Sequence, residues 1–170
     1  MDRDWGRLTM DLFKIWLDGN RDHSALVSRS YKSFYQNENR MPYVGKINEE
    51  LDTYGDAVLK LAICAILYDR KDVDKENITE LKIKYETDKA LVGVIARHYD
   101  LIDYIKFDRN NGKIPTDYDY RDDGYKYIAT ALEASLAAIY IEENRSIKKI
   151  LEIVEGWMRL VDEAKGQIRD

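Results

Sequence analysis

The sequence contains a single cysteine, Cys64, so no disulfide can form within the chain and no zinc site built from several cysteines is available. Only two prolines and nine glycines occur among 170 residues, which favours helices with short connections over a sheet rich in tight turns. The longest apolar stretch, residues 57–68, is interrupted by Lys60 and is too short to cross a bilayer. These absences predict a helical protein without a membrane-spanning segment.

An excess of positive charge is also missing, because the formal net charge is −5 at pH 7. A protein that relies on phosphate contacts normally presents a positive field, so any binding of nucleic acid must be local or assisted by metal. The first residues, Met1 to Trp5, lack the basic-then-apolar order of a secretory signal. We therefore expect a cytoplasmic protein that does not associate with membranes.

Hydrophobic residues make up 45% of the chain, enough for one compact core, so we predict a single domain over residues 1–170. Apolar side chains recur at helical spacing in successive segments. We expect helices near residues 8–19, 22–34, 48–68, 78–85, 87–99, 124–142 and 146–164. Residues 108–124 are rich in Asp, Asn, Gly and Tyr, and they predict an exposed loop rather than a calcium site.

Two carboxylates, Asp52 and Asp56, stand four residues apart in the most apolar predicted helix, so they share one helix face. A third acid, Glu133, interrupts another apolar segment, residues 128–140. Three acids on two packed helices would form an oxygen-rich site for Mg²⁺ or Mn²⁺, ions that activate water and neutralise an attacked phosphodiester. The same pattern also describes acids that simply face solvent, so spacing alone leaves both interpretations open.

The residues around these acids resemble the ribonuclease III family. Residues 48–59, NEELDTYGDAVL, are similar to the signature NERLEFLGDAVL and match it at eight of twelve positions. Upstream, residues 25–31, ALVSRSY, resemble ALTHRSY. Downstream, residues 133–140, EASLAAIY, resemble EALIGAIY, and Lys126 falls where that helix often opens with a lysine. The motifs keep the family's order and spacing over about residues 8–160.

This resemblance implies an all-α helical bundle of the ribonuclease III endonuclease type, and a metal-dependent endoribonuclease that cuts double-stranded or structured RNA. It also implies four acidic positions. Asp52 takes the place of the first glutamate, while Asp56 and Glu133 match the second and the last acid. Thr130 stands where the family carries an aspartate. A neutral hydroxyl is at best a weak or water-mediated ligand, so we expect Asp52, Asp56 and Glu133 to bind the metal with reduced affinity.

The resemblance further implies a homodimer, since family enzymes pair through the signature segment, where a large apolar residue fits into the partner. Thr53 stands at that position, and the neighbouring Tyr54 can take over the contact. We expect no double-stranded-RNA-binding domain after the last helix, which makes the chain similar to the short mini-ribonuclease III subgroup. The alternative function is a catalytically impaired dimer that serves as an RNA- or protein-binding scaffold.

Two other groups of residues carry side chains capable of chemistry. His23 and His98 lie far apart in the sequence, without partnered carboxylates nearby, and neither is predicted to be catalytic. Three basic residues form a small cluster that could contact phosphates, although a solvated helix face is the favoured interpretation: Arg145, Lys148 and Lys149.

Overall fold

The computed structural model of the chain describes residues 11–37, 45–108 and 126–166. These residues form helices joined by short turns, with no β-strand among them, and this confirms the predicted all-α fold. The predicted loop at residues 108–124 lies outside the described residues after its first position, as does the beginning of the first predicted helix.

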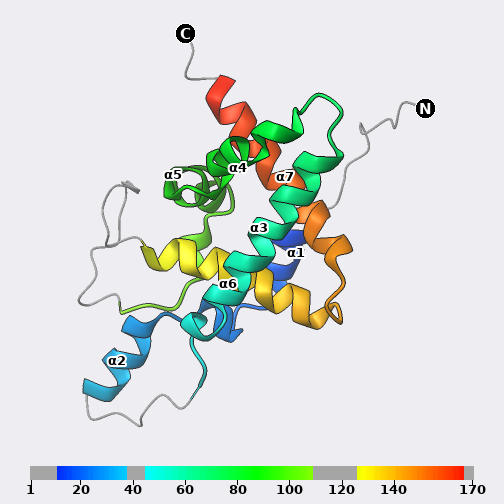
Figure 1. Cartoon of the computed structure of the whole chain (residues 1–170). Coiled ribbons are helices and arrows are strands. Elements are labelled where there is room, and N and C mark those ends of the chain that lie inside the picture. The colour runs from blue at the N-terminus through cyan, green and yellow to red at the C-terminus, as the bar shows by residue number, and fades with distance from the viewer. Residues whose placement is uncertain (1–10, 38–44, 109–125, 167–170) are drawn as a thin grey trace.

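Two long helices cross at the front of the molecule in Figure 1. They are α3 (Asp52–Asp69) and α6 (Lys126–Glu142), and α7 (Ile147–Gly166) packs against both. The short helix α1 (Leu12–Gly19) packs on α7 behind this crossing. The helices predicted at residues 48–68, 124–142 and 146–164 are therefore confirmed, with differences of a few residues at their ends.

Helix α6 is largely buried because its sequence consists mainly of small and aliphatic residues. Its buried positions are Ile128, Ala129, Ala131, Leu132, Ala134, Ser135, Leu136, Ala137, Ala138 and Ile139. The Ser135 hydroxyl donates to the carbonyl oxygen of Ala131 at 2.7 Å, so this buried polar group is satisfied within the helix. Alanine combines high helix propensity with a short side chain, which lets a neighbouring helix approach α6 closely.

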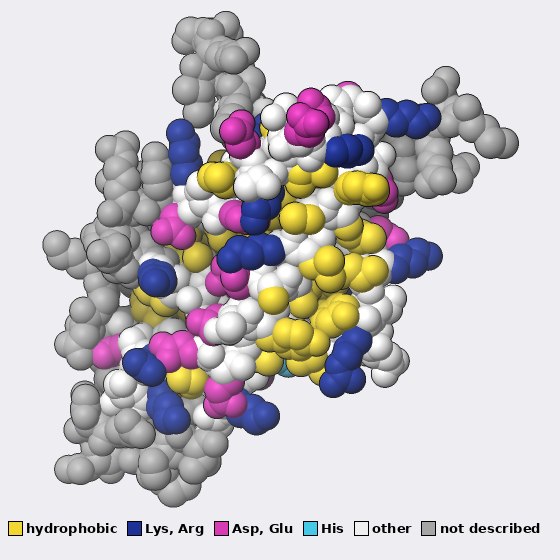
Figure 2. Space-filling model, in the orientation of Figure 1, with side chains coloured by type: hydrophobic (Ala, Val, Ile, Leu, Met, Phe, Trp, Pro, Cys, Tyr) yellow, Lys and Arg dark blue, Asp and Glu magenta, His cyan; other side chains and the backbone are white. Residues whose placement is uncertain are grey.

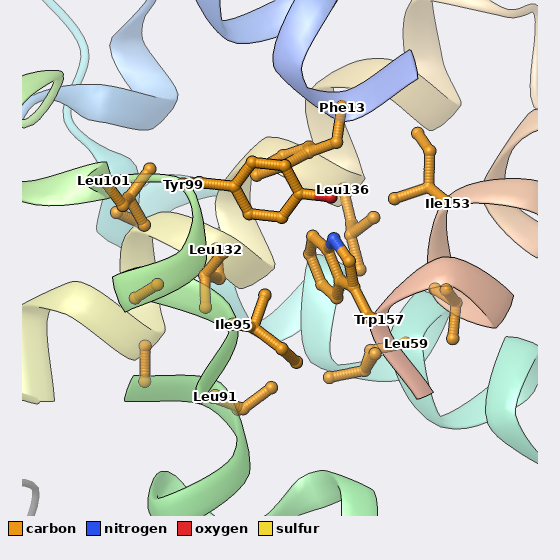
Figure 3. Packing of buried hydrophobic residues seen from close by; sticks show 14 of the residues in the cluster. Phe13, Leu59, Leu91, Ile95, Tyr99, Leu101, Leu132, Leu136, Ile153 and Trp157 are labelled. Atoms are coloured by element: carbon orange, nitrogen blue, oxygen red, sulfur yellow. The ribbon is translucent and has the colours of Figure 1, made fainter. Parts of the chain in front are cut away.

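The core joins α1, α3, α6 and α7 around a group of aromatic rings. Figure 3 shows Phe13, Tyr99 and Trp157 close together among aliphatic side chains. Phe13 lies edge-on to both other rings, with centroid distances of 4.9 Å. Burying one large apolar side chain stabilises a fold by about 1.5–3 kcal/mol, so these residues hold the helices in fixed relative positions.

A second layer of helices packs against α3 and leads into the core. Helix α4 (Ile78–Glu86) confirms the predicted helix at residues 78–85. After it, the Thr87 hydroxyl accepts from the Ala90 backbone N–H at 3.3 Å and caps α5 (Asp88–Ala90). The chain continues as a π-helical turn, η4 (Leu91–Ala96), within the helical run predicted for residues 87–99.

The helix predicted for residues 22–34 is wrong in its first half. There the chain forms a short 3-10 turn, and α2 (Arg29–Asn37) begins only afterwards. The physical reason is a pair of long-range backbone hydrogen bonds that form a parallel bridge at Val27: the Lys106 N–H donates to the Leu26 carbonyl oxygen at 2.7 Å, and the Ser28 N–H donates to the Lys106 carbonyl oxygen at 2.9 Å. These long-range bonds use backbone groups that a continuous helix would need for itself.

Within the described residues, no helix has the length and apolar character that crossing a membrane requires. The cytoplasmic location expected from the sequence stays a prediction.

Candidate active site

The two helices that carry the candidate acids meet at Gly55. A Cβ atom added to Gly55 would lie 1.8 Å from the carbonyl oxygen of Glu133 and 2.2 Å from its carbonyl carbon. These distances are far inside van der Waals contact, and the opposing atoms belong to the backbone, which cannot swing away. Glycine is therefore required for this close approach of α3 to α6. The contact sets Asp56, the next residue on α3, beside the turn of α6 that carries Glu133.

Asp52 and Asp56 occupy successive turns of α3, as their spacing predicts. The Asp52 carboxylate accepts a hydrogen bond from the Thr53 backbone N–H at 2.5 Å, at the first turn of the helix. The Asp56 carboxylate accepts from the Lys60 ammonium group at 2.6 Å, and the Asp56 side chain is 38% exposed. Both acids are thus accessible to solvent and to a ligand.

Glu133 projects from the buried helix α6 into the same electrostatic neighbourhood. Burial, followed by the negative charges of Asp56 and Asp52, raises the pKa of Glu133 from its usual 4.5 to about 7, while Lys60 acts in the opposite direction. Acids that repel one another in this way favour a proton or a cation among them. The structure therefore brings Asp52, Asp56 and Glu133 into one acidic cluster.

Thr130 precedes Glu133 by about one turn of α6 and is partly buried. Residues three apart on a helix lie on neighbouring parts of its surface, so Thr130 is beside the acidic cluster but adds no charge to it. Its predicted role as a diminished ligand stays a prediction.

The donor chemistry of the cluster suits a hard divalent cation, because Mg²⁺ and Mn²⁺ bind carboxylates together with several waters. Among the described residues, however, no three Asp, Glu, His or Cys side chains converge closely enough to hold a metal ion. Asp56 is directed to Lys60, and Asp52 folds back onto its own helix end. The donor set therefore suits a metal ion by its chemistry, and rotation of these side chains would be needed to bring their oxygens together.

Three charged residues near the acids were not identified from the sequence as part of a site. Lys60 binds Asp56, Glu86 adds negative charge near Lys60, and Asp88 adds negative charge near Glu133. Lys60 follows Asp56 by four residues, and this spacing was a usable signal for an ion pair on a helix. Glu86 and Asp88 come from the junction of α4 and α5, so only the tertiary fold reveals their proximity.

The other candidate residues have contacts of their own. His23 has a carboxylate neighbour after all, since its Nε2 lies 3.7 Å from Glu142, and its Nδ1 accepts from a backbone N–H. That Glu142 side chain also accepts from the indole N–H of Trp16 at 2.9 Å. The prediction that the histidines are not catalytic stays a prediction.

In the basic cluster, Lys149 pairs with Glu143 at 2.7 Å, whereas the other two members are exposed.

The described residues thus form an all-helical fold with two acids on α3 and a glutamate on α6. The family model for the Ribonuclease III domain matches residues 49–144, more than half of the chain, including α3 and α6. The chain belongs to this family.

The chain is also similar to curated proteins named Ribonuclease 3. It is 29% identical over 117 residues to the one from Pseudomonas fluorescens (strain Pf0-1), which covers 68% of this chain and 48% of that protein. It is 29% identical over 125 residues to the protein from Pseudomonas entomophila (strain L48), which covers 73% of this chain and 50% of that protein. It is 27% identical over 150 residues to the protein from Pseudomonas putida (strain GB-1), which covers 84% of this chain and 61% of that protein. The chain thus spans roughly half to three fifths of the length of these relatives.

Proposed function

We propose that this chain is a metal-dependent endoribonuclease that hydrolyses phosphodiesters in double-stranded or structured RNA. The observation that carries the proposal is the contact between Gly55 and the backbone of Glu133, which sets the acids of α3 and α6 together within a ribonuclease III domain. Glycine inside a helix lowers stability relative to alanine, and this glycine stands where the two helices that carry the acids meet.

The residues of the cluster have two kinds of role in this proposal. Asp52, Asp56 and Glu133 supply carboxylate oxygens to Mg²⁺ or Mn²⁺, and Thr130 supplies a neutral hydroxyl beside them. When bound, such an ion supplies Lewis-acid stabilisation of the attacked phosphodiester and an activated water. Glu133 must lose its proton to act as a ligand, and its raised pKa makes this step sensitive to pH near neutrality. The missing fourth charge at Thr130 weakens the site.

A second copy of this chain is the proposed partner, bound through an exposed apolar stripe on α3. Tyr54, Leu61 and Tyr68 stand seven residues apart and are 39%, 56% and 64% exposed. Ile141 at the end of α6 is 43% exposed, and Tyr54 lies edge-on to Tyr140 with a centroid distance of 5.9 Å. Figure 2 shows apolar side chains gathered over α3 and the end of α6, beside a strip of mixed charges. A twofold pairing of this stripe would supply two acidic clusters to one duplex.

The substrate class is tested by comparing one RNA sequence as a labelled duplex and as a single strand, each with Mg²⁺ or Mn²⁺ at low salt. Low salt favours binding by a protein whose net charge is negative. Cleavage of the duplex in preference to the single strand is the expected result. Equal cleavage of both would contradict the proposed substrate class. RNA binding without cleavage would favour the alternative, a non-catalytic scaffold.

A further inference from the structure

Lys60 places a positive charge inside the acidic cluster. It follows Asp56 by one turn of α3, and its ammonium nitrogen lies 2.6 Å from the Asp56 carboxylate. The Lys60 side chain is 45% exposed, so its ammonium group lies at the solvent-accessible side of the acids. Asp56 is one of the three proposed metal ligands, and the ammonium group occupies one of the lone-pair directions of its Oδ2 atom, where it competes electrostatically with a metal ion.

The surroundings of Lys60 are acidic on more than one side. Glu86, the last residue of α4, and Glu133, on α6, both add to the attraction on its ammonium group. Asp56 thus contacts the Lys60 ammonium group directly, and carboxylates on α4 and α6 attract it from a longer distance. Charge neutralisation of this kind is also what a divalent ion would provide at the same place.

We propose that Lys60 is an internal competitor of the divalent ion: its ammonium group pairs with Asp56 and opposes the binding of a second cation there. The inference rests on the proposed function, because it concerns the same acids. It makes Lys60 a positioning residue that sets the metal affinity of the site. Together with the neutral Thr130, it predicts a site that fills only at high concentrations of divalent ion.

The size of the effect of Lys60 on metal affinity follows from the solvent exposure of the ion pair between Lys60 and Asp56. Ion pairs between residues four apart on an exposed helix face are weak, so a divalent ion can break this one readily. After displacement the lysine still carries its charge a few ångströms from the metal, and that repulsion persists in partly exposed surroundings. Removing the charge is therefore expected to increase metal affinity by roughly threefold to tenfold.

The test is a calorimetric titration of the full chain with Mn²⁺ alone, without RNA. Lys60→Gln removes the charge, Lys60→Met does so with a similar length of side chain, and Lys60→Arg keeps the charge. The matched control is Lys149→Gln. It removes an ion pair with a similar nitrogen-to-oxygen distance, 2.7 Å between Lys149 and Glu143, on another part of the surface. A fifth variant, Asp56→Asn, removes a proposed ligand. Circular dichroism confirms that each variant is folded.

The proposal predicts tighter Mn²⁺ binding for both uncharged variants, with Lys60→Arg and Lys149→Gln within about twofold of the wild type. Unchanged or weaker binding by the uncharged variants, while Asp56→Asn loses binding, would overturn the role of Lys60 and leave the proposed metal site standing. Tighter binding by Lys60→Arg as well would show that charge is not the cause, and would overturn the proposal too. No binding by any form up to millimolar Mn²⁺ would overturn both Lys60's role and the metal site.

Discussion

The carbonyl oxygen of Glu133 lies only 1.8 Å from the point where residue 55 would carry a Cβ atom. One glycine thus controls both the packing of α3 on α6 and the distance between the acids that these helices carry. Because the opposing atoms belong to the backbone, a larger residue forces the helices apart rather than displacing a side chain.

Gly55→Ala is expected to destabilise the fold by about 1–3 kcal/mol, the usual cost of overpacking a close contact. Gly156 on α7 provides the matched control, since a Cβ added there meets nothing within 4 Å. Gly156→Ala should be neutral or stabilising by up to about 1 kcal/mol, because alanine has the higher helix propensity. Urea denaturation of both variants measures the difference. Equal effects of the two substitutions would contradict the proposed tight contact.

The pKa of Glu133 predicts a pH dependence of stability. A carboxyl whose pKa is raised from 4.5 to about 7 in the folded state contributes stability below pH 4.5 that is lost as the pH rises through 7. Glu133→Gln removes the charge, and should be more stable than the wild type at pH 8 by about 1–2 kcal/mol after allowance for solvent screening. At pH 4.5 the difference should disappear.

Urea denaturation in the presence of a chelator, at pH 4.5 and pH 8, measures this effect. Glu155→Gln, at an exposed position of α7, controls for the loss of a glutamate as such. A variant Glu133→Gln that shows the same stability difference from wild type at both pH values would contradict the raised pKa.

Thr130 offers a way to restore the charge that the family pattern contains. Thr130→Asp adds a fourth carboxylate beside Glu133, and should tighten Mn²⁺ binding by about tenfold, equivalent to 1.4 kcal/mol. Thr130→Asn has nearly the same shape without the charge and should remain within about twofold of the wild type. Titration calorimetry compares the three proteins. If the asparagine variant gains as much as the aspartate variant, the added charge is not responsible.

The apolar stripe on α3 predicts that one charge will disrupt self-association. Leu61→Glu places a carboxylate in the centre of the stripe, where the native side chain is 56% exposed, and should convert a dimer to a monomer. Ile15→Glu is the matched control, because Ile15 is 52% exposed on α1 and outside the stripe. Light scattering coupled to size exclusion gives the mass of each variant. A wild-type monomer, or a dimer that survives Leu61→Glu, would contradict the proposed interface.

Much of the fold follows from local patterns in the sequence. The long runs of apolar residues in α3 and α6 predict helices that pack into the core, although α3 also keeps an exposed apolar stripe. The four-residue spacing of Asp52 and Asp56 sets these acids on one face of α3. The helix predicted for residues 22–28 is absent because Leu26 and Ser28 form backbone hydrogen bonds with Lys106, about eighty residues away. No local propensity contains that information.

Some residues of the candidate site could also be predicted from the sequence, and others only from the fold. Asp52, Asp56 and Glu133 were recognised because their motifs carry them, whereas the charges of Glu86 and Asp88 reach the cluster only through the packing of α4 and α5. Lys60 was treated as an interruption of an apolar run, although its spacing from Asp56 indicated an ion pair. The candidate ligands can therefore be predicted from local motifs, whereas the charges that surround them depend on the tertiary packing.

The most direct test of the account is the initial rate at which the wild type and the double variant Asp56→Asn, Glu133→Gln cleave a labelled RNA duplex with Mn²⁺. Both proteins must be shown to be folded, and Glu155→Gln serves as the control for an exposed acid. The account predicts metal-dependent cleavage by the wild type and by the control, and its loss in the double variant. Cleavage that survives in the double variant, or its absence from a folded wild-type protein with either Mg²⁺ or Mn²⁺, would contradict it.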